Sequence, residues 1–188
     1  FESKGQTWRK EAIEKILRHF DENMPVDDSI LNWNDFFSSY LLFIIACELC
    51  ELDFDGLILF KRTSSWDIDW IKEKGPYSDF QINILIKCSD YFRNKTDQIS
   101  TLIEISNELF CQGNLTESEL VLKRAKVDAS ITKDISKLTR ISSEFYQRCN
   151  YKQSDSLILE AILITNSIKF PLMKNRALLE ICIELAKQ

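Results

Sequence analysis

Apolar residues recur every third or fourth position along most of this chain, which is the spacing of one face of an α-helix. In the segment from Thr7 to Phe20 they fall at Trp8, Ala12, Ile13, Ile16, Leu17 and Phe20. The same periodicity predicts helices over approximately 31–52, 53–62, 78–93, 97–112, 116–129, 132–148, 153–167 and 171–187. The chain contains only 4 Gly and 3 Pro residues, so turns are few and elements are long. We therefore predict an all-α fold.

One stretch, SSWDIDWIKEKGP, fits either a strand or a helix. In a strand, Trp66, Ile68 and Trp70 would share one face; in a helix, Trp66 and Trp70 lie one turn apart. We predict a helix, because a single strand would have no partner to pair with. Asp67 and Asp69 then point roughly 160–200° apart, so they do not converge as a pair of catalytic acids.

The stretch NELFCQGNLTESELVLKRA has an apolar series on either side of Gly113. Glycine adopts left-handed backbone angles without a steric penalty, and asparagine tolerates them. We therefore predict that Gly113 ends the first helix of a hairpin and that Asn114 helps the chain to reverse.

Four further residues predict where three of the helices begin. Thr116 and Glu119 have the spacing of a capping box, in which each side chain bonds the other residue's backbone N–H. Thr132 is suited to cap the next helix, and Pro171 suits a first turn, where its missing N–H is not needed. The short connections between the helices predict that successive helices are antiparallel neighbours.

The same order of side chains occurs in successive hairpins. The first has Leu102, Ile105, Ser106 and Leu109, a turn at Gly113, then Ser118, Leu122 and Ala125. Moving 36 residues along gives Leu138, Ile141, Ser142 and Phe145, a turn at Cys149, then Ser154, Ile158 and Ala161. Moving 40 more gives Leu178, Ile181, Cys182 and Leu185, and a weaker copy of the pattern lies within 40–63. Small residues recur where two helices would touch, with large residues beside them.

This order of small and large residues resembles the tetratricopeptide repeat, a helix-turn-helix unit of about 34 residues. The spacings of 36 and 40 residues are longer, and neither Trp nor Tyr stands at the family's signature positions, so a related repeat with longer units fits as well. The resemblance implies a right-handed α-α superhelix of stacked hairpins over 31–188. Its clearest units are 97–130, 133–168 and a truncated 171–188, and residues 1–30 form an N-terminal helix that could act as a cap.

The last unit has only its first helix. The turn equivalent to Gly113 would come just beyond Gln188, so we expect the chain to be a fragment of a longer array. A hairpin without its second helix leaves an apolar stripe uncovered. This stripe offers a surface for pairing with another copy of the chain.

Charge and cysteine content narrow the classes of partner. The net charge is −5, with −6 in residues 1–78 and +1 in 79–188, which disfavours nucleic acid as a partner. The 6 cysteines are scattered rather than arranged as a disulfide framework, which indicates reduced thiols and a cytoplasmic location. The most apolar run, YLLFIIACELC, meets Glu48 after 8 residues, too few to span a membrane. The chain begins at Phe1 rather than Met, so targeting is left open.

No residue constellation indicates catalysis or a bound cofactor. Cys47 and Cys50 have metal-like spacing, but a tetrahedral zinc site needs two more ligands, and no second such pair follows. The single histidine, His19, excludes most histidine-based acid–base schemes. There is no glycine-rich phosphate loop and no Gly-x-Ser-x-Gly elbow. We predict a protein that is not an enzyme and carries neither metal nor cofactor.

The concave wall of a helical repeat, lined by the first helix of each hairpin, is its usual binding surface. The side chains predicted to line it are Ile103, Asn107, Phe110, Thr139, Ser143, Tyr146 and Gln147. We expect this wall to bind a protein or peptide, so that the chain acts as a scaffold. Alternatively, the chain is the helical arm of a larger enzyme or secreted effector whose catalytic part lies elsewhere.

Some tetratricopeptide proteins clamp a terminal carboxylate with Lys, Asn and Arg side chains. Asn107 and Arg140 are similar to part of that clamp. Ile103 and Thr139, however, stand where basic or amide groups would be expected.

Overall fold

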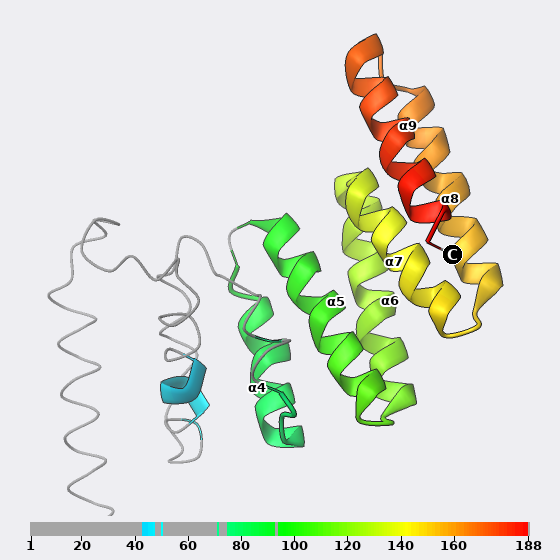
Figure 1. The fold of residues 1–188 in the computed structure, drawn as a ribbon. Helices are drawn as coiled ribbons and strands as arrows, with labels where there is room; N and C mark the ends of the chain where they lie inside the picture. Colours follow the sequence, from blue (N-terminus) through cyan, green and yellow to red (C-terminus); the bar gives the residue numbers. More distant parts are fainter. Residues whose placement is uncertain (1–42, 48–49, 51–70, 72–74, 93, 188) are drawn as a thin grey trace, which may run out of the picture.

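The computed structural model describes residues 43–47, 50, 71, 75–92 and 94–187, and every regular element in those ranges is a helix (Figure 1). The labelled helices are α4 (Asp79–Ser89), α5 (Lys95–Cys111), α6 (Leu115–Thr132), α7 (Ile135–Gln147), α8 (Tyr151–Asn166) and α9 (Pro171–Leu185). Residues 43–47 are also helical. The all-α prediction is confirmed for this part of the chain. The helices predicted within residues 1–30 and within nearly all of 51–74 fall outside the described residues.

Helices α5 and α6 run antiparallel and pack along each other, and α7 and α8 do the same (Figure 1). The turns that join them are residues 112–114 and 148–150. Contacts between α5 and α7, and between α7 and α9, join the first helix of each pair to the next. Helix α9 also packs against α8. Equivalent faces of α5, α7 and α9 therefore follow one another along the molecule.

Asparagine and aspartate side chains mark where four of the helices begin. Each of these side chains accepts a hydrogen bond from a backbone N–H in the first turn, which would otherwise have no partner. The four residues are Asn94, Asn114, Asp134 and Asn150. Helix α9 begins with Pro171 in its first turn, as predicted from the sequence.

Two predicted caps are wrong. Helix α6 begins at Leu115, and its cap is Asn114, whose Oδ1 accepts from the N–H of Glu117 while its Nδ2 donates to Glu117 Oε2 at 2.8 Å. Thr116 therefore lies inside the helix rather than at its cap. Thr132 is the last residue of α6, and its hydroxyl donates to the Asp128 carbonyl at 3.0 Å. In both places a side chain with a stronger capping preference lies two residues from the predicted cap.

The turn predicted at Gly113 is present, and it recurs 36 residues later. Gly113 has φ +81°, and the N–H of Asn114 donates to the Leu109 carbonyl at 2.9 Å. Cys149 has φ 59°, and the N–H of Asn150 donates to the Phe145 carbonyl at 2.8 Å. Both ends have the bonding of a Schellman motif, in which one left-handed residue closes the helix.

Pairs of buried serines join the two helices of each hairpin. The hydroxyls of Ser106 and Ser118 each donate to the other residue's carbonyl oxygen at 2.7 Å. The hydroxyl of Ser142 donates to the Ser154 carbonyl at 3.0 Å, and the two hydroxyl oxygens lie 2.8 Å apart. A side chain this small lets the backbones approach closely, and the hydrogen bonds compensate for its burial. The prediction that these small residues meet is confirmed.

Large apolar residues beside the serines form the core. The buried side chains at matching offsets are Leu102, Ile105, Leu109, Leu122 and Ala125 in the first hairpin and Leu138, Ile141, Phe145, Ile158 and Ala161 in the second. These are the positions that the sequence pattern predicted to be apolar and packed. Because these buried side chains occupy one face of α5 and of α7, only the remaining faces of these two helices can make other contacts.

Candidate interaction surface

The structure separates the predicted wall residues into buried and accessible groups. Ile103 is fully buried, and Thr139 and Ser143 are also buried. The expectation of an open wall is therefore wrong at these three positions, because adjacent helices cover them. Asn107 and Tyr146 are half-buried, whereas Phe110 and Gln147 are exposed. Whether the accessible residues bind a partner stays a prediction.

Asn107 and Ser143 lie at equivalent positions and make equivalent bonds to the following helix. The amide of Asn107 donates to Glu144 Oε1 at 3.0 Å, and the hydroxyl of Ser143 donates to Glu184 Oε2 at 2.9 Å. Each bond crosses from one first helix to the next, from α5 to α7 and from α7 to α9. Asn107 and Ser143 therefore both stabilise the packing of successive hairpins.

Arg148 is the residue that sequence reasoning missed most clearly. Its guanidinium donates to Ser106 Oγ and to Asn107 Oδ1, both at 2.8 Å, and lies 4.9 Å from the centre of the Phe110 ring. Partial burial lowers the pKa of Arg148, and the nearby Glu144 carboxylate opposes that effect. The side chain therefore reaches from the end of α7 back to the first hairpin.

A sequence signal for Arg148 did exist. Gln112 occupies the equivalent position 36 residues earlier, and its amide donates to the Tyr77 carbonyl at 2.9 Å. In both hairpins a long polar side chain just after the first helix reaches the preceding part of the structure. Two long polar residues at matching offsets would have indicated this contact.

Arg140 is already paired with a carboxylate of the same chain. It forms an ion pair with Glu104, a residue of α5 whose side chain is only 3% exposed. The positive charge of Arg140 thus compensates a charge that would otherwise be costly to bury. The part of the carboxylate clamp suggested by Asn107 and Arg140 is therefore occupied by contacts within the chain.

The carboxylate of Glu184 in α9 accepts a hydrogen bond from Ser143 of the preceding hairpin, and its surroundings favour the ionised form. Partial burial would raise its pKa, but hydrogen bonds from Lys187 Nζ, at 2.6 Å, and from Ser143 Oγ hold the pKa below the usual 4.5. A carboxylate with a depressed folded-state pKa stabilises the fold above its unfolded-state pKa. That contribution disappears as the pH falls through the folded-state pKa.

Replacing Ser143 with alanine tests this contact. We expect the free energy of unfolding to fall by about 1 kcal/mol at about pH 7, because a hydrogen bond to a charged group is lost. The difference from wild type should shrink at a pH below the depressed folded-state pKa of Glu184, where the carboxylate is protonated. Urea unfolding at both pH values measures it, with Ser136→Ala at an exposed position of α7 as the control. An equal loss at both pH values would show that the Glu184 charge is not involved.

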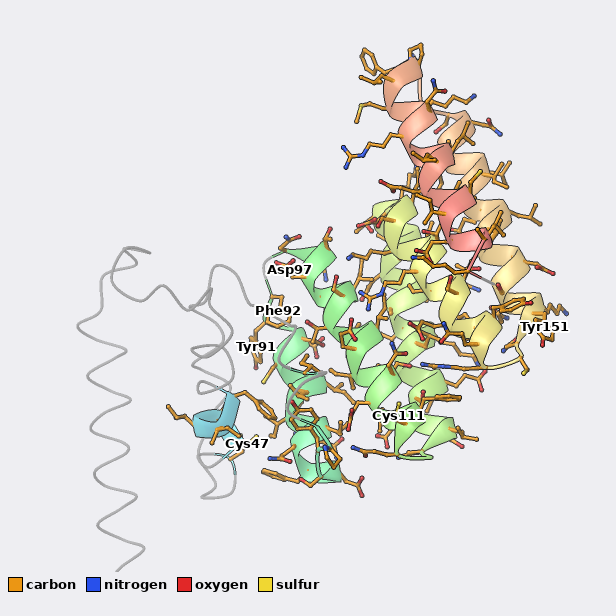
Figure 2. The ribbon with its side chains drawn as sticks, in the orientation of Figure 1. Cys47, Tyr91, Phe92, Asp97, Cys111 and Tyr151 are labelled. Atoms are coloured by element: carbon orange, nitrogen blue, oxygen red, sulfur yellow. The ribbon has the colours of Figure 1, made fainter. Side chains whose placement is uncertain are left out.

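Aromatic residues remain accessible near the turns of the hairpins. Phe110 and Tyr146 are equivalent residues 36 positions apart, and 38% of Phe110 is exposed even though Arg148 lies over its ring. Tyr146 packs edge-to-face against Tyr151, with ring centres 5.0 Å apart. Figure 2 shows Cys111 at the end of α5 and Tyr151 at the start of α8, both at the lower, turn end of the hairpins. An accessible aromatic position thus recurs at this end.

The cysteines give no indication of a metal site within the described ranges. Cys47 is buried and Cys50 half-buried, and every described cysteine is a free thiol. No group of His, Cys, Asp or Glu side chains in these ranges could hold a metal ion. Burial, the main cause, raises the pKa of Cys88 far above its usual value, which makes that thiol unreactive. His19, Asp67 and Asp69 lie outside the described residues.

Searches of protein-family models, curated proteins and solved structures found no match to this chain. In the ranges that the structure describes, no helix is long and apolar enough to cross a membrane.

Proposed function

We propose that the chain is a non-catalytic helical-repeat scaffold that binds a protein or peptide. The observation that carries the proposal is the recurrence, at a spacing of 36 residues, of the same turn and the same serine contact. Stacked units of this kind present equivalent side chains in a row, as in the right-handed α-α superhelix of tetratricopeptide proteins. The finer fold and the binding function are both part of this proposal.

The accessible aromatic pair, Phe110 and Tyr146, is the proposed binding surface, with Gln147 beside it. Neighbouring packed helices lie about 8–10 Å apart, and a peptide in the polyproline II conformation advances about 3.1 Å per residue with about three residues per turn. A peptide crossing α5 and α7 would therefore bring every third side chain to an aromatic position. Aromatic side chains contribute much of the binding energy in such contacts, because they bury a large area at low entropic cost.

Replacing Phe110 and Tyr146 together with alanine tests the proposal. Peptides selected from a displayed random library on the wild-type chain should lose at least about tenfold in affinity for this double variant. Fluorescence anisotropy with the selected peptides measures the loss. Thermal unfolding of both proteins separates a lost surface from a lost fold, since Phe110 also supports Arg148.

The matched control removes two exposed leucines from the second helices. Leu120 in α6 and Leu159 in α8 are more exposed than Phe110 but lie away from the first helices. The Leu120→Ala/Leu159→Ala variant should bind the selected peptides as wild type does. Unchanged binding by the Phe110→Ala/Tyr146→Ala variant would refute the proposed surface.

A further inference from the structure

Each complete hairpin carries accessible apolar side chains at two matching positions beside its turn. Phe110 and Tyr146 lie near the ends of the first helices, and Leu115 and Tyr151 are the first residues of the second helices α6 and α8. Leu115 is 59% exposed and Tyr151 is 51% exposed. The rings of Tyr146 and Tyr151 are in contact, with centres 5.0 Å apart. Two equivalent apolar pairs, Phe110 with Leu115 and Tyr146 with Tyr151, therefore follow one another along the molecule.

The first pair remains accessible with the following hairpin in place. Helix α7 packs against both α5 and α6, and Arg148 lies over the Phe110 ring at 4.9 Å from its centre. Phe110 nevertheless keeps 38% of its surface exposed, and Leu115 keeps more. The exposure of this pair is therefore a property of the stacked hairpins.

The charged side chains that join α5 to α7 near these pairs offer little charge to a partner. The side chains of Arg148 and Glu144 are only 9% and 15% exposed. Arg148 donates to Ser106 and Asn107, and Glu144 accepts from the Asn107 amide. Because both charges are bonded within the chain, an occupant gains little from a charge of its own. The surface favours an uncharged segment.

The polar groups beside the aromatic rings can donate hydrogen bonds. Gln147 is exposed, so its amide is accessible, and the hydroxyl of the half-buried Tyr146 is a second donor. In the polyproline II conformation the backbone carbonyls have no partner within the peptide, and proline has no backbone N–H. A proline-rich segment therefore offers mainly acceptors, which complements these donors.

We propose that the segment bound at the two apolar pairs is proline-rich and adopts the polyproline II conformation. One turn of that conformation is three residues and about 9 Å long, close to the distance of about 8–10 Å between packed helices. Prolines three residues apart then pack on successive pairs, and the preformed conformation loses little entropy on binding. The inference rests on the proposed function, since it names the class of peptide for the same surface.

Two labelled peptides of identical composition test the inference on the full chain. One is decaproline made of L-residues, and the other alternates L- and D-proline, which prevents the regular polyproline II helix. We expect the L-peptide to bind at least about tenfold more tightly in fluorescence anisotropy, because only its prolines repeat at the spacing of the two pairs.

Variants of the chain locate the binding. Phe110→Ala/Tyr146→Ala should weaken binding of L-decaproline at least about tenfold. Leu115→Ala and Gln147→Ala change exposed residues, so the fold should tolerate them, and each should weaken binding about threefold. Leu120→Ala/Leu159→Ala should bind as wild type does. L-decaproline that binds these variants and wild type equally would overturn the inference.

The comparison of the two peptides separates this inference from the proposed function. If L-decaproline binds no more tightly than the mixed peptide, the proline-rich inference is wrong. The proposed function would still hold if library-selected peptides lose affinity for the Phe110→Ala/Tyr146→Ala variant. Apolar anchors seven residues apart in those peptides would identify a helical partner and would also overturn the inference.

Discussion

Replacing Arg140 with alanine is expected to lower the free energy of unfolding by about 3 kcal/mol. Glu104, its partner, is 3% exposed, so the substitution leaves a buried carboxylate without the guanidinium that compensates it. Arg140 is itself 30% exposed, which places the expected loss at the lower end of the range for buried pairs. Urea or guanidinium unfolding, followed by circular dichroism, measures the change.

The Glu104→Leu/Arg140→Leu double variant provides the control. When both charges are replaced by apolar side chains, no buried charge is left uncompensated, and the loss should be much smaller than for Arg140→Ala alone. Comparing single and double variants isolates the coupling between the two residues. If the double variant is as unstable as the sum of both single variants, the pair does not act as a unit.

The second large effect concerns the contact between the two helices of a hairpin. Ser106→Leu should destabilise the chain by about 3 kcal/mol or more, because the larger side chain forces α5 and α6 apart. The substitution also removes the hydroxyl that donates to the Ser118 carbonyl and accepts from Arg148. Thermal and denaturant unfolding of the purified variant measure the loss.

Ser156→Leu is the matched control, since Ser156 is an exposed serine of α8. The same change of side chain there should alter stability by no more than about 0.5 kcal/mol. Ser106→Ala should cost less than Ser106→Leu, because alanine keeps the close approach and loses only the hydrogen bonds. A Ser106→Leu variant as stable as wild type would show that the small side chain is not required at this contact.

The order of small and large residues predicted the hairpin contacts well. Ser106 with Ser118 and Ser142 with Ser154 meet as the offsets suggested, and Cys149 adopts the left-handed angle of Gly113. These features depend on residues close together along the chain and on helical periodicity. Such local rules apply before any tertiary contact forms.

The helix starts were predicted less well, although the signals are local. Thr116 and Glu119 have capping-box spacing, yet Asn114 is the cap of α6. The Schellman turn ends at Asn114, so the next helix begins at Leu115. Asn114 already accepts from an N–H of the first turn, and Thr116 lies inside the helix, where it cannot act as the cap. Spacing alone does not rank competing caps, because the preceding turn fixes where the next helix can begin.

The exposure of the proposed binding wall was the least predictable feature. Ile103, Thr139 and Ser143 fall on the face expected to be open, but all three are buried among the packed helices. How closely successive hairpins stack depends on contacts such as Asn107 with Glu144, between residues far apart in the sequence. The accessible part of the surface is therefore narrower than the sequence indicated.

By itself, the sequence determined that this part of the chain is helical, where the hairpins turn and which small residues bring their helices together. Each of these follows from side-chain size and spacing within one helix or one turn. Only the tertiary structure decided that Arg140 pairs with Glu104, that Arg148 reaches the first hairpin and that α9 keeps an apolar face uncovered. Burial and ion pairing depend on the distance between hairpins, which no single segment of the sequence encodes.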